Sequence, residues 1–219
     1  MRAILDLVFP SSCLSCGARG AVWLCGACED TVPWITTGCA RCGRPAARDT
    51  ADCKDCRAPP PAFRRARAAA VYAGPARDAL KAYKIGGERR SAKHFAGAMG
   101  GATAELDADV VTFVPSTRLG RSKRGFDPAE ELALHVARML GKPKRRLLRK
   151  VRETADQASL DASERRRNLR GAFEARHAAG AVLLVDDIFT TGATARECAA
   201  TLASAGIPQI DVLTFARAL

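Results

Sequence analysis

The chain has 219 residues and a formal net charge of +12, and only 5% of its residues are aromatic. No apolar run approaches the ~20 residues that a membrane-spanning helix needs, and the length suits one hydrophobic core with a small extra module. The first ten residues, MRAILDLVFP, carry Asp6 within their apolar part and lack a clean small-residue cleavage site, which argues against a signal peptide. We interpret them as a short docking helix that ends at Pro10, in a protein expected to be cytoplasmic.

Eight of the nine cysteines lie in four Cys-x-x-Cys pairs near the N-terminus. The pairs are Cys13/Cys16, Cys25/Cys28, Cys39/Cys42 and Cys53/Cys56. Two such pairs brought together offer the four thiolates of a tetrahedral structural zinc site, so the spacing predicts two Zn²⁺ sites. Four disulfides would need an exported protein, and a thioredoxin-like redox motif would need a single pair in a βαβ setting. Pairing in chain order is favoured, and interleaved pairing stays open.

A proline run from Pro59 to Pro61 separates two parts of the chain. We predict a double zinc ribbon with a short N-terminal helix over 1–58 and an α/β domain over 63–219. Short apolar runs predict strands at 68–72, 110–114, 181–185 and 210–215. Helical patterns alternate with these strands at 75–84, 88–100, 128–140 and 195–205. The alternation predicts a parallel sheet covered by helices on both faces.

Two of the predicted helices carry side chains with an expected role. Asp127-Pro-Ala-Glu130 has the form of a capping box with Pro128 at the first position of the 128–140 helix, so Asp127 is expected to cap that helix. Cys198 lies among alanines in the 195–205 helix and is expected to be a buried, unreactive thiol.

Two adjacent acids, Asp186 and Asp187, follow the apolar run 181–185. In an open parallel sheet, ligands bind outside the carboxyl ends of the strands, which is where these carboxylates are expected. The residues after them lead into a helix and offer hydroxyls, backbone N–H groups and a positive dipole end to a phosphate. These residues are Thr190, Thr191, Gly192, Ala193 and Thr194. Acids beside a phosphate would repel it unless they face sugar hydroxyls or a cation, so a phosphorylated sugar fits both features. A turn with a helix cap is the simpler interpretation of Thr-Thr-Gly by itself.

The whole stretch 181–206 resembles the phosphoribosyl-diphosphate (PRPP) loop of type I phosphoribosyltransferases. The resemblance implies that Asp186 and Asp187, as the catalytic pair, contact the ribose 2- and 3-hydroxyls, and that residues 190–194 hold the 5-phosphate. Mg²⁺ would enter with PRPP and be held chiefly by the oxygens of the ligand itself.

Two more segments narrow the family, namely VPSTRLGRSKRGFDPAEELA (114–133) and ADQASLDASERRRNLRGAF (155–173). With the four cysteine pairs before them, they resemble the ComF family of competence proteins, which includes the GntX-like proteins, over nearly the whole chain. The resemblance implies a double zinc ribbon followed by a type I phosphoribosyltransferase-like α/β domain. It also implies a role in natural transformation and DNA uptake, single-stranded DNA as a partner, and contact with the uptake machinery at the inner membrane. No acceptor for a transferase reaction is implied.

The sequence departs from the family pattern at two places. Asp127 stands where the family usually has asparagine, which adds a negative charge near the expected phosphate pocket. The run Pro115 to Arg118 lacks the usual histidine and further arginines, so contact with pyrophosphate would fall to Arg118 and backbone amides.

Basic residues gather in 118–170, which holds 16 Lys and Arg against 7 Asp and Glu. A charged run is usually a solvated face, but this excess lies on both sides of the predicted anion site and exceeds what one diphosphate needs. It favours a longer polyanion such as a nucleic acid backbone, bound through phosphates because aromatic platforms are few. The residues assigned to single-stranded DNA are Arg121, Lys123 and Arg124, in an expected loop, and Arg165, Arg166 and Arg167, in a segment that the family resemblance makes a mobile loop. Eight zinc-bound thiolates make the ribbons acidic, so they are not expected to be the main DNA surface.

Three functions fit the sequence. The first is a PRPP-binding, transferase-like protein of DNA uptake that binds single-stranded DNA. The second is an active phosphoribosyltransferase acting on a nucleobase or an amine, although no base-reading residues can be named. The third is a zinc-ribbon nucleic-acid adaptor with a vestigial pocket, against which the intact Asp186, Asp187 and Thr-Thr-Gly loop argue.

Overall fold

A computed structural model describes residues 12–21, 23–57, 59–152 and 167–219. The expected N-terminal docking helix lies outside these residues, as do Arg165 and Arg166. Among the described residues, no helix combines the length and the apolar character that crossing a bilayer requires.

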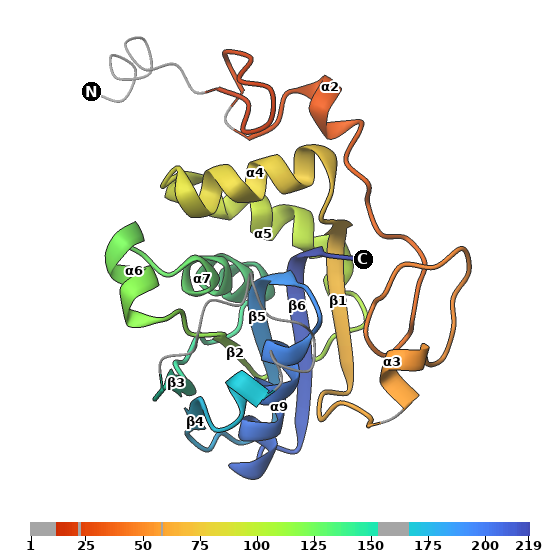
Figure 1. Ribbon diagram of the computed structural model, residues 1–219, viewed down its shortest axis with the longest axis vertical. Coiled ribbons are helices and arrows are strands. Elements are labelled where there is room, and N and C mark those ends of the chain that lie inside the picture. Colours follow the sequence, from red (N-terminus) through yellow and green to blue (C-terminus); the bar gives the residue numbers. More distant parts are fainter. Residues whose placement is uncertain (1–11, 22, 58, 153–166) are drawn as a thin grey trace.

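Four parallel strands form the central sheet (Figure 1). They are β1 (Arg65–Val71), β2 (Val110–Phe113), β5 (Ala181–Phe189) and β6 (Gln209–Arg217), arranged in the order β1-β6-β5-β2. All four correspond to strands that the sequence predicted. Strand β5 runs four residues past the apolar run, because Asp186, Ile188 and Phe189 still pair with β6. The two acids therefore lie within the strand rather than after it.

Helices cover both faces of the sheet, which confirms the predicted architecture. One face carries α4 (Gly74–Ile85), α5 (Ala92–Gly100) and α7 (Pro128–Leu140), with the 3₁₀ turns η1 (Arg89–Ser91) and η2 (Gly101–Thr103). The other face carries α9 (Ala193–Ser204) and a small antiparallel pair, β3 (Leu148–Lys150) with β4 (Phe173–Ala175).

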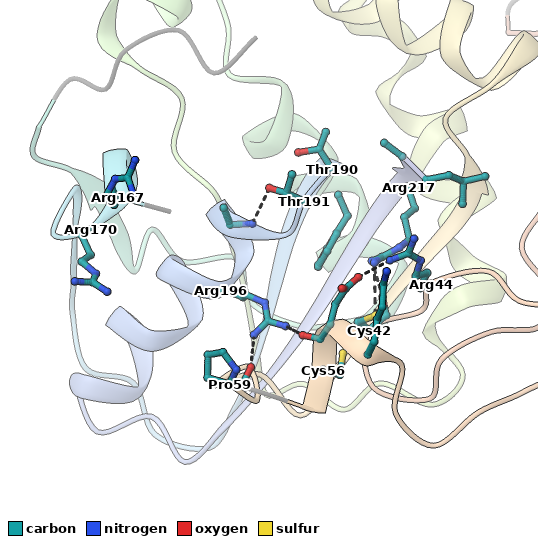
Figure 2. A pocket seen from close by; sticks show the side chains of 16 residues that line it. Cys42, Arg44, Cys56, Pro59, Arg167, Arg170, Thr190, Thr191, Arg196 and Arg217 are labelled. Atoms are coloured by element: carbon teal, nitrogen blue, oxygen red, sulfur yellow. Dashed lines mark hydrogen bonds and ion pairs between the residues drawn. The ribbon is translucent and has the colours of Figure 1, made fainter. Parts of the chain in front are cut away.

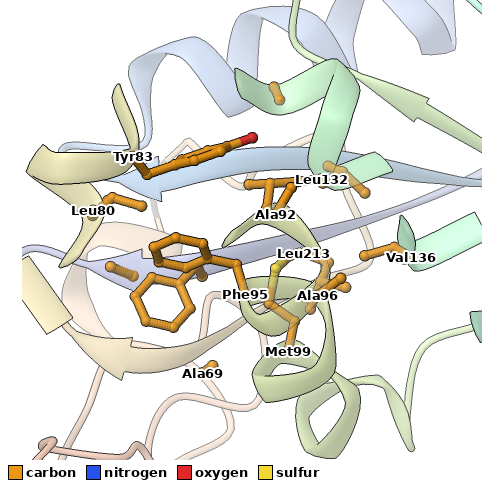
Figure 3. Close-up of a cluster of buried hydrophobic side chains, with 14 of the residues drawn as sticks. Ala69, Leu80, Tyr83, Ala92, Phe95, Ala96, Met99, Leu132, Val136 and Leu213 are labelled. Carbon is orange, nitrogen blue, oxygen red and sulfur yellow. The ribbon is translucent and has the colours of Figure 1, made fainter. Parts of the chain in front are cut away.

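The two faces bury separate hydrophobic clusters, because alternate residues of a strand point to opposite sides. Leu183 and Val185 of β5 face the α5–α7 side, and Val182 and Leu184 face α9. Figure 3 shows the first cluster, in which Phe95 of α5 is surrounded by side chains from α4, α7 and the sheet.

The ribbon segment wraps the α4–α5 side and the β1 edge of the sheet (Figure 1). It contains the short helices α2 (Gly26–Glu29) and α3 (Lys54–Arg57). Trp23 packs edge-on against Phe95, with 4.3 Å between ring centroids, and against Phe215 at 5.8 Å. The first ribbon therefore shares the core of the α/β domain.

The segment between β2 and α7 differs from the sequence prediction in two ways. Arg118–Arg124 forms a helix, α6, where a loop was expected. Pro128 begins α7 as predicted, but the expected cap by the side chain of Asp127 is wrong. The buried carboxylate of Asp127 instead accepts hydrogen bonds from the backbone N–H and the hydroxyl of Ser116, at 2.9 and 3.1 Å, and makes none to the first turn of the helix. Asp127 thus ties the end of β2 to α7.

Candidate functional site

The eight paired cysteines form two tetrads in chain order, as favoured from the sequence. Cys13, Cys16, Cys25 and Cys28 make one tetrad, and Cys39, Cys42, Cys53 and Cys56 make the other. Within each tetrad, all sulfur atoms lie within 4.8 Å of one another, and Cys16–Cys25 and Cys42–Cys53 approach to 3.7 Å. Tetrahedral zinc with bonds of ~2.3 Å would hold its sulfurs about 3.8 Å apart, so both tetrads fit structural Zn²⁺.

Backbone N–H groups support the thiolate form in each tetrad. The Cys13 sulfur accepts a hydrogen bond from the N–H of Cys25 at 3.3 Å, and the Cys39 sulfur accepts one from Cys53 at 3.3 Å. Burial by itself would raise the pKa of both thiols, but the backbone donors outweigh it and lower the pKa of Cys13 to about 6 and that of Cys39 to about 7.

Arg217, at the end of β6, joins the second tetrad to the sheet. Its buried guanidinium donates to the carbonyl of Cys42 at 2.7 Å and to the Cys42 sulfur at 3.5 Å. The same group lies over the ring of Phe189, 4.3 Å from its centroid. The second ribbon is therefore fastened to the carboxyl edge of the sheet, directly beside the predicted phosphate loop.

The two acids of β5 point to opposite faces of the sheet. Asp187 is buried and its carboxylate pairs with the Lys84 ammonium of α4, with 2.7 Å between Nζ and Oδ2. Asp186 lies on the α9 side, where its carboxylate accepts a hydrogen bond from the backbone N–H of Asp187 at 2.9 Å. Burial raises the pKa of Asp186 well above its ordinary value, and the neighbouring Asp187 raises it further.

The residues from Thr190 to Thr194 form an open turn into α9. Thr190 and Thr191 are exposed, and Gly192 adopts the left-handed conformation with φ of 76°. A Cβ atom on Gly192 would lie 2.4 Å from the ring of Phe189, so only glycine fits this turn. Asp186 shares a shallow depression with Thr190, Gly192 and Thr194, whereas Asp187 lies outside it.

The other predicted anion-binding residues occupy different places along the same edge. Arg118 and the exposed Arg121 and Lys123 belong to α6, which begins beyond the end of β2. Arg118 lines a cavity of about 310 Å³ together with Arg149 and Arg152. Arg124 is partly buried and donates to the hydroxyl of Ser116 at 3.1 Å, so its guanidinium holds the α6 turn in place.

A larger cavity, of about 810 Å³, lies between the second ribbon and the start of α9 (Figure 2). Basic side chains from both parts line it, namely Arg44, Lys54, Arg167, Arg170, Arg196 and Arg217. Arg196 of α9 spans the two parts, because it donates to the carbonyl of Asp55 at 2.5 Å and to that of Pro59 at 3.0 Å. Of these six, only Arg167 was singled out from the sequence.

The thiol of Cys198 is fully buried in α9, as predicted. Burial raises its pKa well above the ordinary value, and the negative charge of Asp186 raises it further. The thiol is therefore protonated and shielded from reagents.

Three kinds of comparison relate this chain to known proteins. A family model for the double zinc ribbon domain matches residues 4–57. The DNA utilization proteins YhgH of Escherichia coli O157:H7 and of Salmonella typhimurium are each 29% identical to this chain, over 234 and 230 residues, with 97% of this chain and 100% of each relative covered. Competence protein F of Haemophilus influenzae is 33% identical over 111 residues, which is 48% of each chain. A solved structure of the allosteric regulatory enzyme of purine biosynthesis shares 23% identity over 57% of this chain and 25% of its own length, with a TM-score of 0.36.

Two cysteine tetrads ahead of a helix-covered parallel sheet define an α/β protein with an N-terminal double zinc ribbon. The similarity to proteins named DNA utilization protein and competence protein agrees with the resemblance to the ComF family that the sequence carries.

Proposed function

We propose that this protein binds PRPP with Mg²⁺ at the β5–α9 turn, binds single-stranded DNA along the adjoining basic edge, and acts in DNA uptake during natural competence. In this role it works in the cytoplasm beside the uptake machinery of the inner membrane. The names of the relatives, DNA utilization protein and competence protein, support the DNA-related role. The observation that carries PRPP binding is the joint placement of Asp186, a left-handed Gly192 and the start of a 12-residue helix in one depression.

The turn supplies groups that suit a phosphate. Backbone N–H groups at the start of α9 lack helical partners, and the helix dipole places partial positive charge there. Thr190, Thr191 and Thr194 add hydroxyl donors, and the absence of a side chain at Gly192 lets the 5-phosphate approach the backbone. Ala193 contributes its N–H, which donates to the Thr191 hydroxyl oxygen at 3.4 Å.

The acids then serve the sugar. Asp186 faces the depression and is placed to accept hydrogen bonds from a ribose hydroxyl. We assign Asp187 to the second hydroxyl, which it would contact from the other face of β5 while paired with Lys84. Mg²⁺ would be held by PRPP oxygens with the help of these carboxylates, and it would neutralise charge on a departing pyrophosphate. We assign contact with this pyrophosphate to Arg118.

Calorimetric titration with Mg²⁺–PRPP tests this site. Replacing Asp186 and Asp187 together with asparagine preserves their shape but removes their charge, and it should weaken PRPP binding by at least about tenfold, which equals ~1.4 kcal/mol. Replacing Asp78, an acid on α4 that pairs with Arg77, is the matched control and should change nothing. Unaltered affinity in the double variant, or no PRPP binding by the parent protein, would refute the site.

The second function, an active transferase, is favoured by one observation. The 810 Å³ cavity adjoins the proposed PRPP site: it shares Phe189 and Thr190 with the depression, and Ala193 with the turn. An acceptor in this cavity would therefore lie beside PRPP. Release of pyrophosphate from PRPP in the presence of an acceptor would establish turnover.

A further inference from the structure

The cavity between the second ribbon and α9 has the composition of an anion site. Six cationic side chains line it. Among its described lining residues, Asp55 is the one Asp or Glu side chain, and it is already paired with Arg44. A zinc-bound tetrad beside it adds a charge of about −2. The positive groups still outnumber the negative ones, so the cavity favours an anionic occupant.

The cations come from two parts of the chain that converge on one space. Arg44 and Lys54 belong to the second ribbon, whereas Arg167 and Arg196 belong to the α9 side. Figure 2 shows Arg44 and Arg217 next to Cys42, with Arg196 reaching from α9 to the ribbon. Arg217 is buried, and its Nε has no hydrogen-bond partner among the described residues. Since this Nε is itself inaccessible, Arg217 contributes its positive charge to the cavity, and the donors available to an anion come from the exposed Lys54, Arg167 and Arg170.

Size and lining indicate a ligand larger than phosphate. A volume of about 810 Å³ is in the range of ligand pockets, which is ~300–1,000 Å³. Pro59, Phe189 and Ala193 supply apolar surface beside the guanidinium groups, and guanidinium planes also stack on flat rings. A phosphate joined to a sugar and a base matches this combination of charge and apolar area.

We infer that this cavity binds a nucleotide through its phosphate, with the second zinc ribbon as one wall of the site. The inference rests on the proposed function only for the identity of the neighbouring ligand, PRPP. That ligand would occupy the turn that shares Thr190, Thr191 and Ala193 with the cavity. The inference gives the second ribbon a binding role, because Arg44 and Lys54 of this ribbon line the cavity. Both residues lie outside the basic stretch 118–170 that the sequence assigned to anions.

The probe is thymidine 5′-monophosphate, titrated calorimetrically into the zinc-loaded full chain without PRPP. It should bind, and thymidine, which lacks the phosphate, should bind at least about tenfold more weakly. Lys54→Glu and Arg167→Glu alter exposed side chains on opposite walls, and each should weaken binding about tenfold. Arg138→Glu, on the exposed surface of α7, makes the same charge change away from the cavity and should leave binding unaltered.

Competition separates the two sources of such a phosphate. If a 5′-phosphorylated oligothymidylate displaces the probe and the same oligomer without its phosphate does not, the cavity binds the end of a strand. If neither oligomer displaces the probe, the cavity binds free nucleotides. Both results support the inference. Asp186→Asn/Asp187→Asn should bind the probe normally, so failure of PRPP binding leaves the inference standing. Equal binding of thymidine and its monophosphate, or equal binding by Lys54→Glu, Arg167→Glu and the parent, overturns it.

Discussion

The neighbouring acids Asp186 and Asp187 should affect stability in opposite directions. Burial and the adjacent acid raise the pKa of Asp186 in the folded protein above the unfolded value of 3.8, so the folded state is penalised as pH rises through that interval. An asparagine side chain cannot ionise, so Asp186→Asn should raise the free energy of unfolding at pH 7. Asp187→Asn breaks the pair with Lys84 and should destabilise it by about 1 kcal/mol.

Urea unfolding at pH 7 and pH 4 measures both effects. The gain from Asp186→Asn should shrink at pH 4, where the carboxyl group of the parent is largely protonated. A loss of stability in Asp186→Asn at pH 7 would mean that the contacts of this carboxylate stabilise the folded protein more than its burial costs. A site acid that costs stability is expected where a protein keeps a charge for its ligand.

Single residues differ in how far the sequence reveals them. The cysteine ligands are evident because a Cys-x-x-Cys turn is local, and the tetrads follow the chain order. Lys84 and Arg196 could not be predicted, because their partners, Asp187 and Asp55, lie more than 100 residues away and no local pattern links them. Asp127 misled the prediction because its position suggests a cap, whereas the fold offers it the donors of Ser116.

At the scale of elements, the last residues of β6 hold the second zinc ribbon in place. Arg217→Lys keeps the charge but loses the fork that donates to the carbonyl and sulfur of Cys42. Because groups around a metal ligand typically change metal affinity ~10–100-fold, this variant should release one of its two zinc ions about tenfold faster. The measurement is transfer of zinc to a coloured chelator over time.

Combining Arg217→Lys with a second substitution shows which ribbon loses its zinc faster. Cys16→Ser removes a ligand of the first tetrad and leaves the second intact. Arg217→Lys should accelerate zinc loss from the Cys16→Ser variant as much as it does from the protein with all eight cysteine ligands. Acceleration of both zinc ions, or of neither, would show that Arg217 does not support the second tetrad specifically.

Long apolar or strongly periodic elements could be predicted, and short ones could not. The four core strands and the helices on both faces follow from apolar runs and from helical patterns of nine or more residues. Strands β3 and β4 have three residues each, which is too few for a period, and they pair across a gap of more than 20 residues. Helix α6 reads RLGRSKR and has no apolar face, so its formation depends on the Thr117 cap, which accepts a hydrogen bond from Gly120 N–H, and on the left-handed Gly125 at its end.

At the scale of the whole molecule, charge and structure point to one edge. The ribbon residues 1–62 carry a net charge of +1 before zinc binding, and residues 63–219 carry +11. Helix α6, Arg149, Arg152 and Arg167 all border the carboxyl edge of the sheet or cavities next to it. Helix α7 begins at this edge and ends at the opposite one, so Arg138 and Lys142 carry similar charge far from it.

That separation allows a test of whether DNA binding depends on a surface or only on net charge. Arg121→Glu/Lys123→Glu and Arg138→Glu/Lys142→Glu change the net charge equally, and all four side chains are exposed. For single strands, the slope of log K against log salt falls by about 0.7 for each phosphate that the protein no longer neutralises, so the α6 pair should reduce the slope by about 1.4 and the α7 pair by little. Fluorescence anisotropy with labelled oligothymidylate, measured across a series of salt concentrations, gives both slopes. If the two pairs weaken binding alike, the DNA is attracted by overall charge and the α6 edge is not its binding surface; if neither does, the strand lies elsewhere on the protein.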